Sequence, residues 1–435
     1  MTLLARLRER GIRRSLADYK AVYAADHVDV GAEQLARLNA GWAESLVRSP
    51  WARAQKARLE LPDQFEDWST FERLVPVQRK ADLRAVLATS VGGAAEVEWR
   101  STGGTTAQPM RLPVFASEAE VAALDIWLGR GRLGISASDR LFLIWGHSHI
   151  FGVGLKGVVG RLRRRASDWA LGYTRWNAYR LAPDDLDRAA DALLQSGASY
   201  VIGYASALDR FARANQGRSA SLHRLGLAAV IATAEGFPRA DSREVLEACF
   251  GCPVIMEYGA VETGPVAYQR PSGGYDVFWA HHRLEALDAE GPGAGREMAV
   301  TSLYPRALPL LRYAIGDLIQ PAAGEDRSLT EFLSVVGRSN EAVTLPDGAV
   351  IHSEAFTHAV RDIPGVRAYQ IVRRQSGTLP AIRYESAAPL TPTDERNLRQ
   401  RMGKVHPLLF NADTEWVSAI PPSVAGKHRT VVDEN

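Results

Sequence analysis

The fold of this chain is decided by residues 200–258, which read YVIGYASALDRFARANQGRSASLHRLGLAAVIATAEGFPRADSREVLEACFGCPVIMEY. Three runs within it, YVIGY, AAVIAT and PVIMEY, are short and rich in β-branched and aromatic residues, which predicts strands. The segments between them predict helices, and Asp241 and Glu244 have the spacing of a capping box at the start of the second helix. This succession of strand, helix, strand, helix and strand is typical of a layered α/β domain.

Two loops in this region are expected to carry chemistry. TAEGF (233–237) and YGAVETG (258–264) each follow a predicted strand. Ligands of open α/β sheets bind just outside the carboxyl ends of the strands. The sequence therefore predicts a ligand site at these loops, with Glu235 and Glu262 as its first candidates.

The length of 435 residues predicts two domains, because single cores stop growing at roughly 250 to 300 residues. Residues 1 to about 90 have apolar residues at helical spacing, and the pattern beyond them predicts short strands between helices. We predict an α/β fold with a large N-terminal domain of layered sheets and helices over 1–337. A small α+β domain over 338–435 is expected to swing on a hinge.

Composition and charge exclude several classes of protein. The 52 Lys and Arg residues nearly balance the 50 Asp and Glu residues, so the basic excess of a nucleic-acid-binding protein is missing. The two cysteines build no disulfide framework and suit a reducing cytoplasm. No window reaches the ~18 apolar residues of a membrane span, and the N-terminus lacks a signal peptide's apolar stretch. We expect a cytoplasmic protein that binds neither nucleic acid nor membrane.

The segment STGGTTAQPMRLP (101–113) is a candidate phosphate loop. It concentrates hydroxyl groups and glycines between two strand-like runs. Such a loop can approach a polyphosphate closely and offer it hydroxyl and backbone N–H donors. It is not a Walker A loop, because no Lys-Ser or Lys-Thr pair closes it.

Three other patterns favour plainer interpretations. The spacing of Gly152, Gly154 and Gly157 matches a dinucleotide fingerprint, which leaves a nicotinamide oxidoreductase as a weak alternative because no acidic residue follows at the right distance. Cys249 and Cys252 form a C-x-x-C pair with no second pair to complete a zinc site, so they are interpreted as buried small hydrophobes. The remaining pattern is a set of histidines expected to have hydrogen-bonded structural roles: His147, His149, His281 and His282.

Eight segments, taken in their order along the chain, resemble the adenylate-forming superfamily of acyl-CoA synthetases. Within it they are most similar to the phenylacetate-CoA ligases and the related capsule-biosynthesis ligases. The segments are LVPVQRKADLR (74–84), STGGTTAQP (101–109), GYASAL (203–208), TAEGF (233–237), YGAVETG (258–264), LRYAIGDL (311–318), VVGRSNE (335–341) and PPSVAGK (421–427).

The resemblance implies a complete set of nucleotide-binding residues. Glu262 would hold Mg²⁺, Asp317 would accept hydrogen bonds from the ribose hydroxyls, and Lys427 would reach the α-phosphate and the attacking carboxylate. The loop around the β and γ phosphates would be Ser101, Thr102, Gly103, Gly104, Thr105 and Thr106. The adenine pocket would be lined by Ala234, Glu235, Gly236, Tyr258, Gly259 and Ala260. Arg338 would lie near the hinge.

The chain departs from its relatives at two places. Ala107 and Gln108 stand where many relatives carry Gly-Lys, which removes a positive charge near the phosphates. At the hinge, SNE replaces the common Ser-Asp-Asp, so the hinge residue is left open among Ser339, Asn340 and Glu341. An active enzyme is still expected, because neither change removes Glu262, Asp317 or Lys427.

The predicted activity is that of an acid-thiol ligase with ATP, Mg²⁺ and coenzyme A. A small carboxylic acid is activated as acyl-AMP, and a thiol such as that of coenzyme A then takes the acyl group. Alternatives keep the first step but use a carrier protein or an amine as acceptor, or a non-carboxylate oxyanion as substrate. A further alternative is a nucleotide-binding module that has lost catalysis.

Aromatic side chains near the predicted pocket favour an aromatic or flat acid, although they are equally at home in a core. They are Trp145, His147, Tyr204 and Phe237. A homodimer is the default oligomeric expectation, because two-fold dimers are the commonest assemblies.

Overall fold

The computed structural model of this protein describes most of the chain. The described residues are 3–25, 28–89, 97–101, 110–145, 165–178, 182–239, 241–287, 295–322, 328–338, 342–352, 356, 359–360, 363–374, 377–420 and 430–434.

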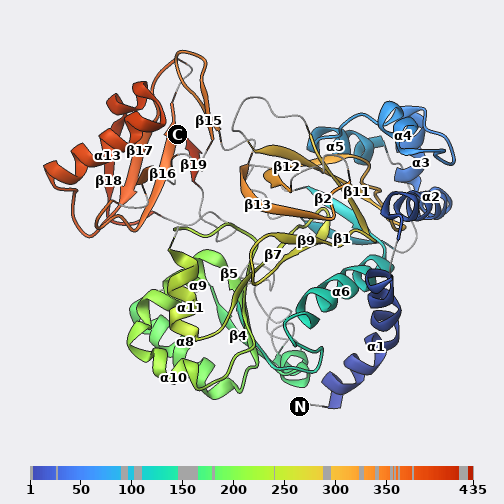
Figure 1. Cartoon of the computed structure of the whole chain (residues 1–435), viewed down its shortest axis with the longest axis horizontal. Helices are drawn as coiled ribbons and strands as arrows, with labels where there is room; N and C mark the ends of the chain where they lie inside the picture. The colour runs from blue at the N-terminus through green and yellow to red at the C-terminus, as the bar shows by residue number, and fades with distance from the viewer. Residues whose placement is uncertain are drawn as a thin grey trace, which may run out of the picture.

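A mixed sheet forms the centre of the large N-terminal part (Figure 1). Over the described residues it has 11 strands in the order β10-β11-β12-β13-β9-β8-β7-β6-β5-β3-β4. The half from β4 to β7 is parallel, and every pairing from β7 to β10 is antiparallel. The strands are β3 (Leu141–Trp145), β4 (Tyr173–Asn177), β5 (Tyr200–Tyr204), β6 (Val230–Thr233), β7 (Val254–Ala260), β8 (Gly264–Gln269), β9 (Tyr275–Val277), β10 (His282–Ala286), β11 (Arg296–Ser302), β12 (Tyr313–Pro321) and β13 (Glu331–Arg338). A separate hairpin joins β1 (Glu98–Ser101) to β2 (Arg111–Val114).

Helices cover both faces of the parallel half of the sheet. Val201 faces a core formed with α8, α9 and α11, whereas its neighbours Tyr200 and Ile202 face a core that includes residues of α1 and α6. Strands buried on both faces in this way explain the nearly continuous apolar runs in the sequence. The helices of this part are α1 (Leu3–Ala24), α2 (Val30–Arg48), α3 (Pro50–Leu59), α4 (Trp68–Leu74), α5 (Lys80–Thr89), α6 (Ala116–Gly131), α8 (Pro183–Ser196), α9 (Ala205–Ala214), α10 (Ser219–His223) and α11 (Ser242–Phe250), with a 3-10 turn at Gln216–Arg218.

The predicted order of strands and helices over residues 200–258 is confirmed, but the capping box is not. Asp241 is the N-cap residue of α11 and its side chain makes no capping hydrogen bond. Its carboxylate instead accepts a 2.6 Å hydrogen bond from Arg213 on α9. An ion pair with the neighbouring helix has replaced the local cap, which sequence spacing alone could not reveal.

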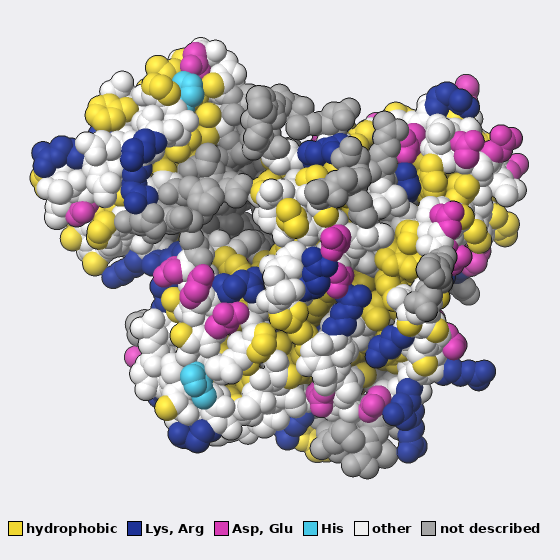
Figure 2. Space-filling model, viewed as in Figure 1, with side chains coloured by type: hydrophobic (Ala, Val, Ile, Leu, Met, Phe, Trp, Pro, Cys, Tyr) yellow, Lys and Arg dark blue, Asp and Glu magenta, His cyan; other side chains and the backbone are white. Residues whose placement is uncertain are grey.

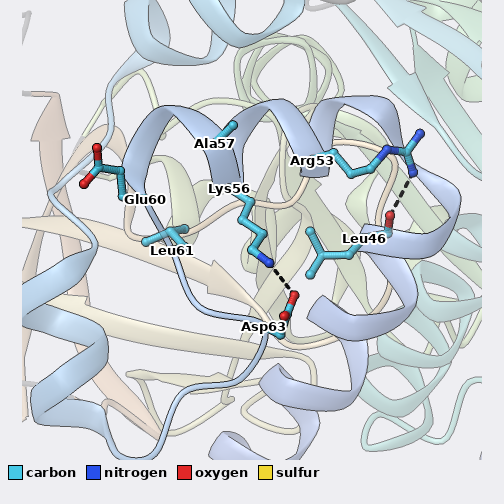
Figure 3. A pocket seen from close by; sticks show the side chains of 7 residues that line it. All are labelled: Leu46, Arg53, Lys56, Ala57, Glu60, Leu61 and Asp63. Atoms are coloured by element: carbon cyan, nitrogen blue, oxygen red, sulfur yellow. Dashed lines mark hydrogen bonds and ion pairs between the residues drawn. The ribbon is translucent and has the colours of Figure 1, made fainter.

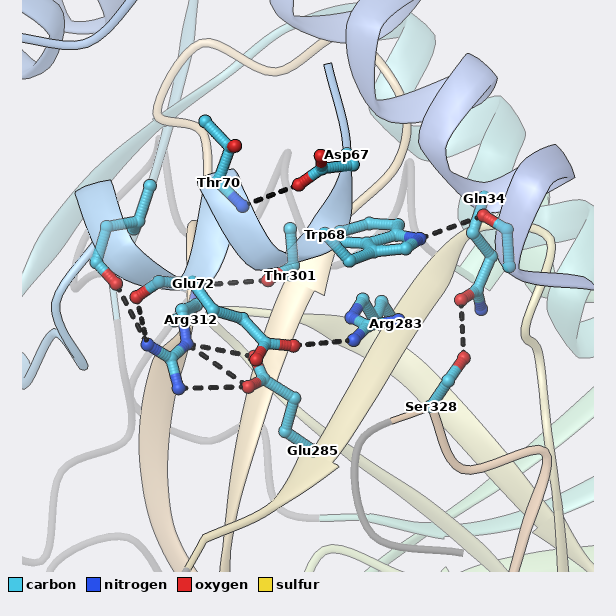
Figure 4. A network of polar contacts seen from close by, with 12 residues as sticks. Gln34, Asp67, Trp68, Thr70, Glu72, Arg283, Glu285, Thr301, Arg312 and Ser328 are labelled. Atoms are coloured by element: carbon cyan, nitrogen blue, oxygen red, sulfur yellow. Dashed lines mark hydrogen bonds and ion pairs between the residues drawn. The ribbon is translucent and has the colours of Figure 1, made fainter. Parts of the chain in front are cut away.

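The helices before residue 90 are tied to the sheet by a buried polar network (Figure 4). Arg283 on β10 donates to Glu72 on α4 at 2.9 Å and lies 3.8 Å from the centre of the Trp68 ring. Arg312 donates to both carboxylate oxygens of Glu285 at 3.1 Å and to two main-chain carbonyls at the end of α4. These bonds fix the start of β12 against the helical layer.

The first helix is held by a second buried network. The Tyr19 hydroxyl donates to Asp125 at 2.5 Å, and the same carboxylate lies 2.9 Å from Nδ1 of His281 and 3.5 Å from Nε2 of His282. Burial alone would raise the pKa of the Asp125 carboxyl, but the two histidines offset this and lower it below its ordinary value. The expectation of structural roles for His281 and His282 is confirmed by these contacts.

Cys249 and Cys252 are free thiols at the end of α11 and just beyond it. Cys249 is 1% exposed, and burial raises its pKa to about 11 and that of Cys252 to about 12. Thiols with such pKa values stay protonated at neutral pH, so they are poor nucleophiles and poor metal ligands. The interpretation as a buried small hydrophobe is confirmed for Cys249, whereas Cys252 is only partly buried against the same core.

A small α/β domain follows the large sheet and lies beside it in Figure 1. Its four-stranded sheet has the order β18-β17-β16-β19, and its own apolar core includes Ile371, Ile382, Leu398 and Met402. The predicted boundary at 337/338 coincides with the last residues of β13, and the exact boundary stays a prediction. The elements are β14 (Ala342–Thr344), β15 (Val350–His352), β16 (Ala368–Arg373), β17 (Ala381–Glu385), α13 (Pro392–Val405), a 3-10 turn at Pro407–Asn411, β18 (Asp413–Val417) and β19 (Val431–Asp433).

The surface carries charges of both signs. On the face shown in Figure 2, Lys and Arg side chains are interspersed with Asp and Glu side chains. Across the described ranges, no helix is both long enough and apolar enough to span a bilayer.

Candidate active site

The loop YGAVETG forms a tight hairpin between β7 and β8. Thr263, which is 1% exposed, accepts a hydrogen bond from the N–H of Ala260 at 3.1 Å and donates to the carbonyl of Gly264 at 2.8 Å. A Cβ atom on Gly259 would lie 2.3 Å from that same carbonyl oxygen, so only glycine fits there. The hairpin therefore holds Glu262 at a fixed place at its tip.

Glu262 is fixed through its main chain by a buried arginine. Arg306 donates to the Glu262 carbonyl at 2.7 Å and to the Glu118 carboxylate at 2.9 Å, and it is 6% exposed. Burial alone would lower the pKa of Arg306, but Tyr304 and Glu118 beside it keep the pKa above its ordinary value. The Glu118 carboxylate also accepts from the N–H groups of Phe115 and Ala307, so a buried polar network supports the hairpin.

The side chain of Glu262 faces a lysine. Its Oε1 lies 3.4 Å from Nζ of Lys80, the first residue of α5, and the Glu262 side chain is 12% exposed. No group of three or more His, Cys, Asp or Glu side chains could hold a metal among the described residues. A Mg²⁺ ion bound through one carboxylate and the phosphates of a nucleotide does not require such a group.

Asp317 and Tyr258 meet although they come from different strands. The Tyr258 hydroxyl donates to Oδ2 of Asp317 at 2.7 Å, and Asp317 is 9% exposed. Gly316, with a φ of +89°, turns the backbone just before Asp317 in a way that favours glycine. Arg338 lies opposite Asp317 in the ladder between β12 and β13. The structure thus brings together three residues predicted at the nucleotide: Tyr258, Asp317 and the main chain of Arg338.

The TAEGF loop leaves the carboxyl end of β6 with a strained residue. Ala234 has a φ of +72°, which costs an alanine roughly 1 to 2 kcal/mol. The Glu235 carboxylate accepts from the N–H of Ser206 at 2.9 Å and from its hydroxyl at 2.5 Å. Glu235 therefore stabilises the start of α9 and ties it to this loop; its predicted place in an adenine pocket, with Gly236, stays a prediction.

Two of the four residues expected near the substrate, Trp145 and Tyr204, lie side by side, and Tyr204 is buried in the core. The rings of Trp145 and Tyr204 stand at the ends of the neighbouring strands β3 and β5, with centroids 4.4 Å apart. Phe237 lies farther along the TAEGF loop, and the Arg243 guanidinium lies 5.4 Å from the centre of its ring. Trp145 and Phe237 both pack against the core beneath α8, α9 and α11, so part of their surface serves the core.

Several predicted residues fall outside the described part of the chain. They are Thr102, Gly103, Gly104, Thr105, Thr106, Ala107, Gln108, His147, His149 and Lys427, together with the hinge candidates Ser339, Asn340 and Glu341 and the alternative fingerprint glycines Gly152, Gly154 and Gly157. Ser101 is described at the end of β1, where it is exposed and pairs with Arg111 of β2.

Sequence reasoning missed three residues that the structure places around Glu262. They are Lys80, Glu118 and Arg306. Lys80 lies in LVPVQRKADLR, which carried a resemblance but no assigned role. Glu118 and Arg306 are 188 residues apart, so only the folded chain brings them together.

An open depression of about 650 Å³ lies elsewhere, on α2, α3 and the following segment (Figure 3). It is lined by Leu46, Arg53, Lys56, Ala57, Glu60, Leu61 and Asp63. Lys56 and Asp63 form an ion pair across it. None of the predicted site residues borders this depression, and we assign it no role.

Comparison with known proteins by sequence gives a partial match. No family model matches the chain. Protein CapK of Staphylococcus aureus is 23% identical over 212 residues, which span 45% of this chain and 46% of CapK, or about half of that relative's length.

Solved structures match over more of the chain. A 2-hydroxyisobutyryl-CoA ligase in the postadenylation state superposes with a TM-score of 0.66 at 19% identity, covering 92% of this chain and 89% of that one. The amide bond synthetase McbA from Marinactinospora thermotolerans gives 0.52 at 18% identity, covering 76% and 67%. The anthranilate CoA ligase AuaEII gives 0.54 at 15% identity, covering 76% and 65%. At these identities the likeness establishes the fold, and it confirms at that level the predicted resemblance to the adenylate-forming superfamily.

Proposed function

Because the chain has the fold of the adenylate-forming ligases, we propose that it is an ATP-dependent ligase that activates a carboxylic acid as its acyl-AMP. The observation that carries this proposal is the 2.7 Å hydrogen bond between Tyr258 and Asp317, with Glu262 four residues after Tyr258 on one rigid hairpin. The first step requires three groups at one site: a tyrosine that lines the adenine, a carboxylate that binds the ribose and a carboxylate that binds magnesium. Adenylation gives the acid a good leaving group, which a free carboxylate does not have.

The residues present fit a Mg²⁺ ion that arrives with ATP. Glu262 offers a carboxylate oxygen, and a hard cation completes its shell with phosphate and water oxygens. When bound, the ion would neutralise charge on the phosphates. The chain's own contribution is to hold Glu262 rigidly, through Thr263 and Arg306, where that charge must be met.

The remaining roles follow the motif order. Ser101 to Thr106 would hold the β and γ phosphates, and Lys427 would offset the charge that develops as the acid's carboxylate meets the α-phosphate. Asp317 would bind both ribose hydroxyls, with Arg338 beside it in the ladder. We propose that residues 338–435 turn as a unit about a hinge near Arg338, so that one protein runs both half-reactions.

The second half-reaction is proposed to pass the acyl group to the thiol of coenzyme A. A carrier protein or an amine is the alternative acceptor, and the amide bond synthetase McbA has the same fold. Trp145 and Tyr204, with rings 4.4 Å apart at the carboxyl ends of their strands, favour a small flat or aromatic acid. The phenylacetate-CoA ligase-like branch, a cytoplasmic location and a homodimer are parts of the same proposal.

Carboxylate-dependent exchange of labelled pyrophosphate into ATP tests the first step. We expect exchange with at least one member of a panel of aromatic and short-chain acids, and its loss in Lys427→Ala. Lys404→Ala, at an exposed position on α13, is the matched control and should exchange as the wild type does. A wild-type protein that binds ATP but exchanges with no acid in the panel would instead support an inactive nucleotide-binding module.

A further inference from the structure

Lys80 is a basic side chain at the candidate nucleotide site that no motif assignment has used. Its Nζ lies 3.4 Å from Oε1 of Glu262, and the Lys80 side chain is 30% exposed. We propose that Lys80 is a phosphate-binding residue, which supplies a positive charge that the sequence STGGTTAQP from Ser101 to Pro109 does not contain. This inference rests on the proposed function and deepens it.

The position of Lys80 is fixed by the main chain just before it. Gln78 donates its N–H to the carbonyl of Arg312 at 3.0 Å and accepts from the N–H of Ala314 at 2.8 Å. The buried Gln78 side chain also accepts a hydrogen bond from Gln55 at 3.0 Å. The segment before α5 is thus paired with β12, the strand that carries Asp317, and Lys80 follows two residues later.

The helix that begins at Lys80 packs against residues that follow the candidate phosphate loop in the sequence. Leu83 and Val86 of α5 lie in one apolar cluster with Met110 and Leu112, which follow that loop. Tyr313 of β12 belongs to the same cluster. One core therefore ties together α5, the strand after the loop and the strand of Asp317, so Lys80 stands at the junction of the three elements expected to surround the phosphates.

Stability gives no adequate reason for a lysine here. A cation in the first turn of a helix is opposed by the positive end of the helix dipole. A partly exposed ion pair contributes little to stability. The preceding Arg79 shows the contrast, because it donates to both carboxylate oxygens of Glu297 at 2.7 Å. The N-terminus of α5 is the positive end of a helix dipole, and the Lys80 ammonium group lies at that end. Together these positive groups favour the binding of an anion such as a phosphate.

The chemistry of the side chain suits an exchange of partners. Lysine is a compact point charge on a flexible stem with three donor hydrogens, so the ammonium can turn from a carboxylate to a phosphate oxygen while the backbone stays fixed. In the nucleotide-free protein Lys80 would neutralise Glu262. With Mg-ATP bound, the Glu262 carboxylate would be available to hold the metal and the Lys80 ammonium group would be available to the phosphates.

Equilibrium binding to the full chain tests this without any catalytic turnover. Dissociation constants for Mg-ATP and for AMP are measured by calorimetry for the wild type, Lys80→Ala and Lys80→Arg. We expect Lys80→Ala to weaken Mg-ATP binding at least tenfold and AMP binding less than twofold, and Lys80→Arg to restore most of the Mg-ATP affinity. The matched control Arg79→Ala, which breaks the neighbouring pair with Glu297, should leave the ratio of the two constants at its wild-type value.

A second readout is the reactivity of the lysine amine. Mg-ATP should protect Lys80 of the wild type from acetylation by acetic anhydride, measured by mass spectrometry, and AMP should not. The role of Lys80 would be overturned if Lys80→Ala keeps the wild-type ratio of the Mg-ATP and AMP dissociation constants, whether neither constant changes or both rise equally. The proposed function would then still stand. A wild-type protein that binds neither nucleotide would overturn both.

Discussion

Tyr258 and Asp317 are joined by a 2.7 Å hydrogen bond although three strands, β8, β9 and β13, separate β7 from β12 in the order of the sheet. The sheet must bend for a side chain of β7 to reach β12. That bend encloses a place where a carboxylate and an aromatic ring meet, which is what recognition of a nucleoside needs.

The first prediction concerns this pair. Asp317→Ala should weaken AMP binding by more than about tenfold, because hydrogen bonds to a charged group are worth roughly 1.5 to 3 kcal/mol. Tyr258→Phe removes a hydrogen bond to the Asp317 carboxylate but leaves that carboxylate in place for the ribose, so it should cost less than about tenfold in AMP affinity. Calorimetric titration with AMP measures both, and an Asp317→Ala protein with wild-type affinity would contradict the ribose assignment.

The second prediction separates the metal from the nucleoside. Glu262→Gln should raise the Mg²⁺ concentration needed for half-maximal pyrophosphate exchange by at least about tenfold, since a neutral amide is a poorer ligand for a hard cation. AMP binding in the absence of magnesium should be unchanged. Glu244→Gln, an exposed glutamate on α11, is the control and should behave as the wild type. Equal magnesium dependence in both variants would argue against the role of Glu262.

The third prediction concerns the support of the hairpin. Arg306→Met leaves the Glu118 carboxylate buried and without its main counter-charge, which should destabilise the protein by about 3 to 5 kcal/mol. Arg188→Met breaks an exposed pair with Asp185, in which Arg188 is 64% exposed, and should leave the denaturation midpoint almost unchanged. Urea denaturation followed by tryptophan fluorescence compares the two, and similar midpoints would show that the Arg306 network is dispensable.

The fourth prediction is a pH dependence of stability. Burial lowers the pKa of His282 below its ordinary value of 6.5, so the unfolded chain binds a proton at this residue more readily than the folded one does. The stability that neutral His282 contributes is complete above pH 6.5 and is lost as the pH falls through the folded-state pKa.

Urea midpoints at pH 7.5 and 5.5 measure this effect. The wild type should lose stability on acidification, and His282→Gln, which cannot titrate, should lose less. Asp125 has a lowered pKa and stays ionised over this range, so it does not obscure the comparison. Equal losses in the two proteins would exclude His282 as a source of the effect.

Sequence patterns alone determined the order of strands and helices between Tyr200 and Tyr258. They could do so because strands buried on both faces leave short, nearly continuous apolar runs, and helices buried along one side leave a helical period in the sequence. They also nominated Glu262 and Asp317, since chemically distinctive residues stand in recognisable motifs.

The tertiary structure alone decided which side chains surround those residues. Arg306 reaches Glu118 across 188 positions, Lys80 reaches Glu262 from another helix, and Asp241 pairs with Arg213 instead of capping its own helix. Contacts between distant segments depend on how whole helices and strands pack, and a local sequence pattern contains no information about that packing. The motifs thus identified the candidate binding residues, whereas the fold determined which charged side chains lie beside them.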